Sequence, residues 1–126
     1  MKEKLLTENA PAAIGPYSQA TRSGNTLYIS GQLPVNPASG DIDAPDAAGE
    51  TKQSLENIRS ILASAGAQMD NIVKTTVFLT DMEDFAAMNA VYAEYFSEPY
   101  PARAAFQVVK LPKNAKVEIE AIAVLE

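Results

Sequence analysis

The sequence predicts an α+β fold in which a mixed β-sheet carries two helices on one of its faces. Two observations lead to this prediction. Segments rich in β-branched and aromatic residues surround two segments with helical spacing, in the order ββαβαββ. The central strand–helix–strand unit favours one parallel pair, and the remaining strands can pair antiparallel. The chain of 126 residues suits one core, so residues 1–126 are expected to form a single domain.

The beginning of the chain predicts a hairpin. Residues 18–22 and 26–31 are the expected strands, and Gly24 and Asn25 between them supply the positive φ angles that a tight turn requires. A short extra strand is expected nearer the N-terminus, at residues 3–7. The first half of the sheet is therefore expected to be antiparallel.

A loop and a helix should follow the hairpin. Residues 33–46 are dense in Pro, Gly and Asp, which is typical of a loop. The next segment predicts a helix over about residues 46–65, and Gly66 is well placed to end it. The apolar stripe of this helix, spaced by three and four residues, consists of Leu55, Ile58, Ile61 and Leu62.

The middle of the chain predicts a strand over residues 71–81 and a second helix over about residues 82–96. Prolines 99 and 101 of "PYP" are expected to stop this helix, because proline disfavours helical angles in the residue before it. The apolar side of the second helix is expected to contain Phe85, Met88, Tyr92, Tyr95 and Phe96.

Two strands, residues 103–111 and 116–125, are expected to end the chain, with a turn at residues 112–115 between them. In the last strand the alternating side chains are Val117, Ile119, Ala121 and Ala123 on one face, and Glu118, Glu120, Ile122 and Val124 on the other. Both faces are apolar towards the end of this strand. Two helices can cover only one face of the sheet, so a second copy of the chain is the simplest cover for the other; a partly exposed face is the alternative.

The composition narrows the possible chemistry. The sequence contains no cysteine and no histidine, which excludes disulfides, thiolate nucleophiles and the Ser-His and Cys-His forms of catalysis within this chain. With 16 acidic and 10 basic residues, the net charge of −6 argues against a surface built for nucleic acid. No leader-like segment and no apolar run of about 18 residues is present, so we expect a cytoplasmic protein without membrane contact.

Arg103 is the first candidate for a functional residue. In "YPARAAF" it stands among small and aromatic residues where the chain enters its last strands. A guanidinium presents parallel N–H donors that match a carboxylate, so one role is to bind an anion. The other role is structural, as an ion pair with Glu118 or Glu120 across neighbouring strands. The pattern alone leaves both roles open.

The two glutamates are the next candidates. Glu118 and Glu120 share a strand face with apolar residues, which can raise the pKa of a carboxyl and suit it to acid–base chemistry; the alternative is that they reach solvent. The acids of "DMED", residues 81–84, are better placed to cap the second helix.

Two turn-rich segments contribute further polar groups. In "GPYSQA", Tyr17 offers a hydroxyl and a ring for stacking. In "YISGQLPVNP", Ser30 offers a hydroxyl and the Ser30-Gly31 stretch offers backbone N–H donors. The alternative is that both segments form ordinary turns with a packed tyrosine.

Several segments together resemble the RidA (YjgF-type) family of reactive intermediate deaminases. They are "ENAPAAIGPYSQA", "YISGQLPVNPASG", "IVKTTVFLTDMEDFAAMNAVYAEYF" and "YPARAAFQVVKLPKNAKVEIEAIAV", and they cover the chain from about residue 8 to residue 124. The resemblance implies a chorismate-mutase-like α+β fold that assembles as a homotrimer, with a site in each cleft between subunits. It also implies the activity of a 2-iminobutanoate/2-iminopropanoate deaminase. Such an enzyme hydrolyses reactive enamine or imine acids, such as 2-aminoacrylate, to 2-keto acids and ammonia without a metal or an organic cofactor.

The resemblance also assigns roles to residues. Arg103 would bind the substrate carboxylate, and Glu118 would position or activate the attacking water, with Glu120 farther along the same face. The pocket would be lined by Tyr17, Ser30, Gly31, Phe85, Asn89 and Ala105. At Ala105 many members of the family carry cysteine, so thiol chemistry is excluded here; "SEPYPAR" is also shorter than in many members. These departures affect the expected substrate preference more than the expected reaction.

Two other functions stay open at this level. Some relatives are described as endoribonucleases or translation inhibitors that act on single-stranded RNA, although the acidic composition gives this interpretation little support. A non-catalytic protein that binds 2-keto acids in the same cleft would also use Arg103. The identity of the imino acid, and the reactions that supply it, are not indicated by the sequence.

Overall fold

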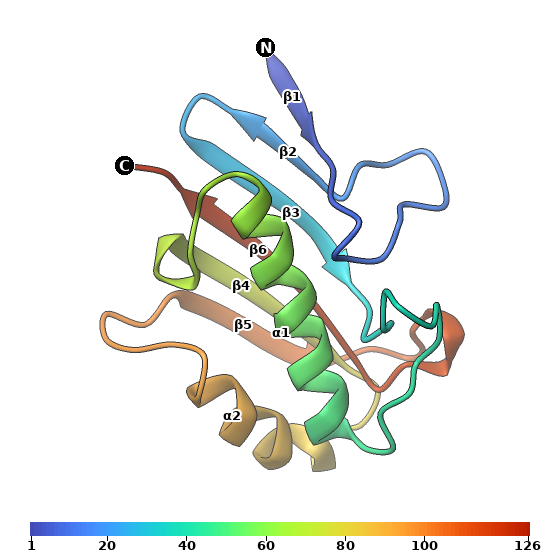
Figure 1. The fold of residues 1–126 in the computed structure, drawn as a ribbon. Coiled ribbons are helices and arrows are strands. Elements are labelled where there is room, and N and C mark those ends of the chain that lie inside the picture. The colour runs from blue at the N-terminus through green and yellow to red at the C-terminus, as the bar shows by residue number, and fades with distance from the viewer.

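The computed structural model describes residues 1–126 and contains one six-stranded β-sheet and two α-helices (Figure 1). The strands are β1 (Lys2–Leu5), β2 (Ala20–Ser23), β3 (Thr26–Gln32), β4 (Ile72–Leu79), β5 (Ala102–Gln107) and β6 (Val117–Val124). The helices are α1 (Ala47–Ser64) and α2 (Phe85–Ala93). The predicted element order, including the extra N-terminal strand, is confirmed.

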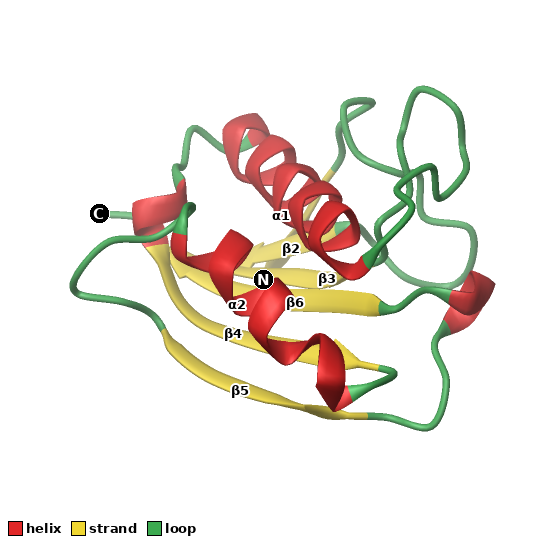
Figure 2. Ribbon diagram, turned by 90° about the horizontal axis from the view of Figure 1, so that it is seen from below, coloured by secondary structure: helices red, strands yellow, loops and turns green.

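The strand order in the sheet is β1-β2-β3-β6-β4-β5. Only β4 and β5 run parallel, as the strand–helix–strand crossover predicts, and every other neighbouring pair is antiparallel. Both helices lie on the same face of the sheet (Figure 2). The prediction of a mixed sheet with its helices on one face is therefore confirmed, and the last strand to be synthesised, β6, occupies a central position.

The hairpin between β2 and β3 needs only one residue with positive φ. Gly24 has a φ of 60°, whereas Asn25 is not among the residues with positive φ, so that part of the prediction is wrong. A type II′ turn places glycine at its first central position and leaves the second with ordinary angles, which explains the difference.

Helix α1 begins and ends as its sequence predicts. Asp46 caps the first turn, where its Oδ1 accepts a hydrogen bond from the backbone N–H of Gly49 at 2.9 Å. At the other end Gly66 has a φ of 73°, and the N–H of Ala67 donates to the carbonyl of Leu62 at 2.9 Å, which completes a Schellman motif. The four residues of the predicted apolar stripe are all fully buried.

Helix α2 is shorter than predicted. A 3-10 turn, Met82–Asp84, precedes it, and Asp81 caps that turn through a hydrogen bond from the N–H of Glu83 at 2.9 Å. At its end the N–H of Tyr95 donates to the carbonyl of Tyr92, so the last turn tightens well before the prolines. This tightening allows Phe96 to enter the core, where it is 8% exposed. The helix thus ends at Ala93, ahead of both prolines, and Phe96 packs in the core beyond this end.

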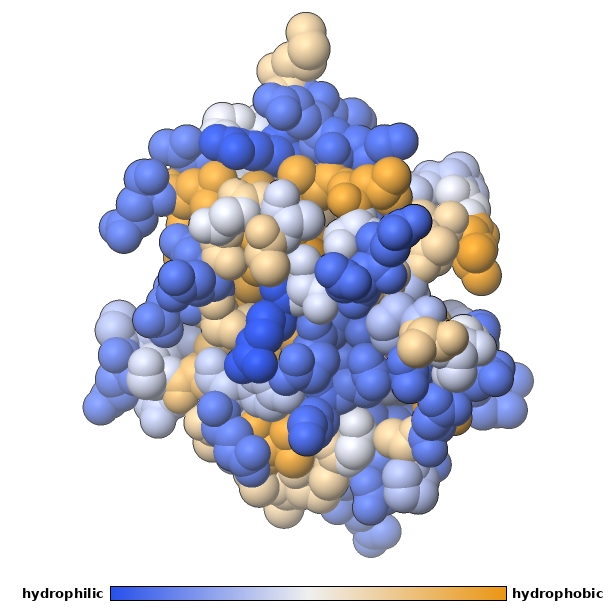
Figure 3. All heavy atoms as spheres, in the orientation of Figure 1, coloured by the Kyte–Doolittle hydropathy of each residue, from blue (hydrophilic) through white to orange (hydrophobic).

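The two faces of the sheet differ in what covers them. In β6 the residues on the helix side are buried, as the alternation predicts. On the opposite side, which we call the open face, Tyr28, Phe106 and Val124 are among the exposed large apolar residues. The helix-covered side shows mainly hydrophilic side chains with smaller apolar groups between them (Figure 3). Neither helix is long and apolar enough to cross a membrane.

Candidate functional site

Arg103 lies on the edge strand β5 and points towards helix α2. Its register partner on β4 is Thr75, whose side chain is buried beneath that helix. The Nη1 of Arg103 donates a hydrogen bond to Oδ1 of Asn89 at 2.7 Å. The guanidinium carbon lies 4.7 Å from the ring centroid of Tyr92 and 5.5 Å from that of Phe85. Helix α2 therefore supplies both polar and aromatic contacts to Arg103.

The predicted alternative, an ion pair between Arg103 and Glu118 or Glu120, is wrong. The ion pairs of the chain are Arg59–Glu56 and Lys116–Glu50, and neither involves Arg103. The physical reason is the strand order: β4 lies between β5 and β6, so the arginine and the glutamates are not on neighbouring strands. The remaining N–H donors of Arg103 are free to bind an anion.

Glu118 leaves the sheet on the open face. Its register partner on β4 is Phe78, whose ring meets Phe106 edge-on with 5.4 Å between the ring centroids. Burial raises the pKa of the Glu118 carboxyl, and the negative charge of Glu120 raises it further. A carboxyl with a raised pKa, half-buried on a sheet, has the properties expected of an acid or base.

A β-bulge brings Ser30 and Gly31 next to these glutamates. Ile29 pairs with Ala121 and Gln32 pairs with Ile119, so Ser30 and Gly31 together oppose one residue of β6. A Cβ built on Gly31 would stand 2.5 Å from Oε2 of Glu118. Glycine at this position therefore leaves the space that the carboxylate occupies.

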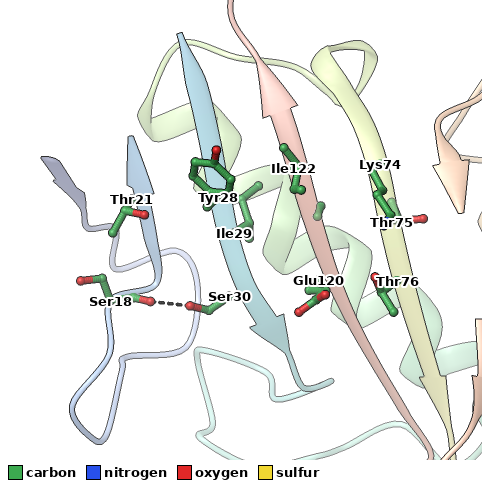
Figure 4. A pocket seen from close by; sticks show the side chains of 11 residues that line it. Ser18, Thr21, Tyr28, Ile29, Ser30, Lys74, Thr75, Thr76, Glu120 and Ile122 are labelled. Carbon is green, nitrogen blue, oxygen red and sulfur yellow. Dashed lines mark hydrogen bonds between the residues drawn. The ribbon is translucent and has the colours of Figure 1, made fainter. Parts of the chain in front are cut away.

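The open face contains a cavity of about 300 Å³ beside the bulge. The hydroxyl of Ser30 donates to the carbonyl of Ser18 at 2.6 Å, and Tyr28, Ser30, Glu120 and Ile122 lie on the side of the sheet opposite to α1 (Figure 4). Ser18, Thr21, Tyr28, Ser30, Lys74, Thr76, Glu120 and Ile122 are among the residues that line this cavity. Its wall is rich in hydroxyl groups and contains one charge of each sign.

A second cavity of about 300 Å³ contains Tyr17. Gly31 and Lys113 also line it, together with apolar residues of the loops. Tyr17 is 51% exposed, so it is not the packed turn tyrosine of the alternative interpretation. Tyr17 and Gly31 thus line one cavity.

The predicted site residues form two groups in the structure. The arginine group consists of Phe85, Asn89, Arg103 and Ala105; Ala105 lies two residues beyond Arg103 and packs against the core. The glutamate group consists of Tyr17, Ser30, Gly31 and Glu118. The arginine group lies on the helix side of the sheet and Glu118 on the open face, so one chain does not bring the two groups together.

Sequence reasoning missed the contribution of Tyr92 and Thr75. The helical spacing predicts only a core position for Tyr92, yet its buried hydroxyl pairs with Thr75 Oγ1 at 2.8 Å while its ring lies under Arg103. Its spacing of seven residues from Phe85 and three from Asn89 was the available signal, because these positions share one face of a helix.

Comparison with known proteins identifies the family. The family model of Endoribonuclease L-PSP matches residues 7–125. A RutC family protein of Pyrococcus horikoshii is 55% identical over the whole length of both chains. The 2-iminobutanoate/2-iminopropanoate deaminase of Escherichia coli K12 is 50% identical and covers 98% of each chain. The crystal structure of E. coli TdcF with bound serine superimposes with a TM-score of 0.93 at 46% identity, covering 98% of this chain and 99% of that one. The chain belongs to the Endoribonuclease L-PSP family, the family of the RidA (YjgF-type) proteins that its motifs resemble.

Proposed function

We propose that the protein hydrolyses small 2-imino acids and their enamine forms to 2-keto acids and ammonia. The observation that carries this proposal is that Arg103 is held in place by neutral groups. Its guanidinium is held by Asn89 and two aromatic rings, without any carboxylate partner in the chain. The 50% identity to the E. coli deaminase over nearly the whole chain supports this reaction.

Arg103 binds the carboxylate of the substrate in this proposal. A guanidinium can form two parallel N–H···O bonds with a carboxylate, which fixes the orientation of the ligand as well as its position. The relative with bound serine indicates that members of this fold accommodate a small amino acid. The carboxylate of a 2-imino acid is adjacent to the reacting carbon, so the clamp places that carbon within the cleft.

Glu118 positions and activates the water. Water adds to C2 of the imine: a C–O bond forms, one water proton passes to nitrogen, and a carbinolamine results. The hydroxyl proton of this carbinolamine then passes to nitrogen, the C–N bond breaks, ammonia leaves, and the carbonyl of the 2-keto acid remains. Glu118 carries both protons in turn, first from the attacking water and then from the carbinolamine hydroxyl, to the nitrogen. Burial raises the pKa of this carboxyl, which makes it a stronger proton acceptor. Tyr17, Ser30 and Gly31 line this part of the site.

The site is completed by a second copy of the chain in this proposal. Arg103 and Glu118 lie on opposite faces of one sheet, so a cleft that contains both must use Arg103 from one subunit and Glu118 from its neighbour. The exposed apolar residues of the open face support its role as the subunit interface. The resemblance to RidA proteins favours a homotrimer with three such clefts.

The test is a coupled assay in which 2-iminobutanoate or 2-aminoacrylate is generated in the reaction mixture and the release of the 2-keto acid is measured. Because these compounds hydrolyse spontaneously, the rate above the uncatalysed background is the quantity to measure. Arg103→Ala should lose at least about tenfold in kcat/KM, because a charge-assisted bidentate contact is removed. Arg59→Ala is the matched control, since Arg59 is also exposed and stacked on a tyrosine. Wild-type rates in a folded Arg103→Ala protein of unchanged assembly would show that the clamp role is wrong.

A further inference from the structure

One face of helix α2 holds the side chain of Arg103 at three points. Phe85, Asn89 and Tyr92 occupy positions i, i+4 and i+7, which share one side of a helix. Asn89 accepts the hydrogen bond from Nη1, and the two rings contact the guanidinium, Tyr92 at 4.7 Å and Phe85 at 5.5 Å. These contacts restrict the rotamers of an arginine that is otherwise exposed on an edge strand.

Tyr92 is itself fixed by its neighbours. Its hydroxyl pairs with Oγ1 of Thr75 at 2.8 Å, and its ring packs against Phe96 with 4.5 Å between the centroids. Thr75 is the residue of β4 in register with Arg103. Burial raises the pKa of Tyr92, so the hydroxyl stays protonated at neutral pH. Strand β4, next to the strand of Arg103, therefore holds the Tyr92 ring that contacts the guanidinium.

A second arginine in the chain shows what is unusual about this arrangement. Arg59 also lies over a tyrosine ring, that of Tyr95, at 4.9 Å from its centroid. Its Nη1, however, binds a carboxylate oxygen of Glu56 at 3.0 Å. Arg59 is thus an arginine whose charge is compensated within the chain, whereas the anchors of Arg103 are a neutral amide and two neutral rings.

The difference matters for anion binding. A carboxylate beside a guanidinium lowers the attraction that remains for a second anion, and it occupies donors that the second anion needs. An amide oxygen orients the guanidinium through a hydrogen bond and leaves its net charge unchanged. Neutral anchors therefore suit an arginine that must bind a ligand carboxylate.

We propose that Asn89 and Tyr92 are positioning residues that fix the guanidinium of Arg103 while leaving its charge available to the substrate carboxylate. This inference rests on the proposed function, because it assigns both residues to the substrate clamp. Asn89 thereby gains a defined role, orienting Arg103 rather than only lining a pocket.

Asn89→Asp is the decisive variant, because it replaces the amide oxygen with a carboxylate of nearly the same shape. At neutral pH we expect the KM for 2-iminobutanoate to rise at least about tenfold, with a smaller change in kcat, because the introduced carboxylate competes with the substrate for Arg103. The pairing with Arg103 lowers the pKa of the new aspartate, so the KM should stay raised throughout the working pH range. Asn89→Ala removes the same hydrogen bond without adding a charge, so a smaller rise in KM for this variant separates competition for Arg103 from a purely structural role.

Tyr92→Leu and Tyr92→Phe separate the ring from its hydroxyl. We expect Tyr92→Leu to raise the KM about three- to tenfold through loss of the ring contact, and Tyr92→Phe to raise it less. Tyr92 is buried, so its substitution can also lower the stability of the fold, whereas Asn89 is exposed and its substitution leaves the core unchanged. Glu56→Gln is the matched control, since it removes the carboxylate at the other arginine–tyrosine pair and should leave the KM unchanged.

Calorimetric binding of 2-oxobutanoate distinguishes failure of this inference from failure of the proposed function. If the wild type turns over no imino acid, but its binding of 2-oxobutanoate is lost in Asn89→Asp and weakened less in Asn89→Ala, the reaction is wrong and the positioning role stands. If the wild type is active and Asn89→Asp has the wild-type KM at neutral pH, the positioning role is overturned. A wild-type protein that neither reacts with nor binds these carboxylates overturns both.

Discussion

The guanidinium of Arg103 lies on the helix-covered face of the sheet, and the carboxyl of Glu118 leaves the same sheet on its open face, two strands away. Within one chain, strand β4 and its side chains separate them. A reaction that needs both groups at one substrate must therefore draw them from two chains. This relationship makes the assembly of the protein a condition of its proposed activity.

Mixing two inactive variants tests this consequence directly. Arg103→Ala and Glu118→Gln should each be inactive alone, but mixed trimers should show about a third of the wild-type activity, because one cleft of the three then combines two intact residues. The measurement is imino acid hydrolysis by co-purified mixed oligomers carrying two different tags. The control is each variant co-expressed with a copy of itself that carries the second tag. Mixed oligomers as inactive as their parents would contradict a shared site.

The pH dependence of the reaction should report on the pair of glutamates. Burial and the neighbouring Glu120 raise the pKa of Glu118, so the base form is lost and kcat should fall as the pH drops through this raised value. Glu120→Gln removes the second cause, which lowers the pKa of Glu118 and should move the acid limb of the kcat profile to lower pH. Burial remains, so the shift should be partial.

Asp70→Asn is the control for this experiment, because it changes the net charge by the same amount at an exposed position that does not affect the pKa of Glu118. Its acid limb should match that of the wild type. If Glu120→Gln leaves the acid limb in place as well, then the ionisation of Glu118 does not limit the reaction.

Gly31→Ala should lower the activity while the chain still folds. The new Cβ would lie 2.5 Å from Oε2 of Glu118, so the carboxylate must move. A displacement of about 1 Å can lower a rate about 100-fold, and we expect a loss in kcat between about 10- and 100-fold. Gly15→Ala is the matched control, because its Cβ would make only ordinary contacts, at 3.5 Å from the ring of Tyr17. Equal rates for both variants would show that the position of the carboxylate is unimportant.

The description of the family as an endoribonuclease raises a further expectation. With a net charge of −6, the protein should not retard single-stranded RNA in a gel at physiological salt. The measurement is a titration of RNA at several salt concentrations, with a basic RNA-binding protein as the positive control. A complex whose affinity falls steeply with salt would contradict this expectation.

Local signals in the sequence predict most of the fold. The start of α1 near residue 46 and its end at Gly66 are both predicted from the chain, because the signals at helix ends act through neighbouring backbone groups. The end of α2 could not be read in this way. It coincides with the entry of Phe96 into the core, which is built from residues of several elements.

In the candidate site too, some features are predicted from the sequence and others depend on long-range contacts. The alternation along β6 predicts that Glu118 and Glu120 share a face, and the structure confirms this. The relation of Arg103 to these glutamates depends on the order of the strands, which long-range pairing decides. The sequence pattern indicates some of the site residues and the resemblance to a family adds Phe85, Asn89 and Ala105, whereas their separation into two groups is visible only in the structure.

The position of each strand within the sheet gives the two halves of the site different mobility. β6 is paired on both sides, so its amide hydrogens should exchange with solvent only when the whole chain unfolds. β5 is paired on one side only, and its amides should exchange through local opening. The carboxyl half of the site is therefore built on the rigid part of the molecule, while the arginine half can adjust to ligands of different size. Binding of a 2-keto acid should slow hydrogen exchange in β5 more than in β6.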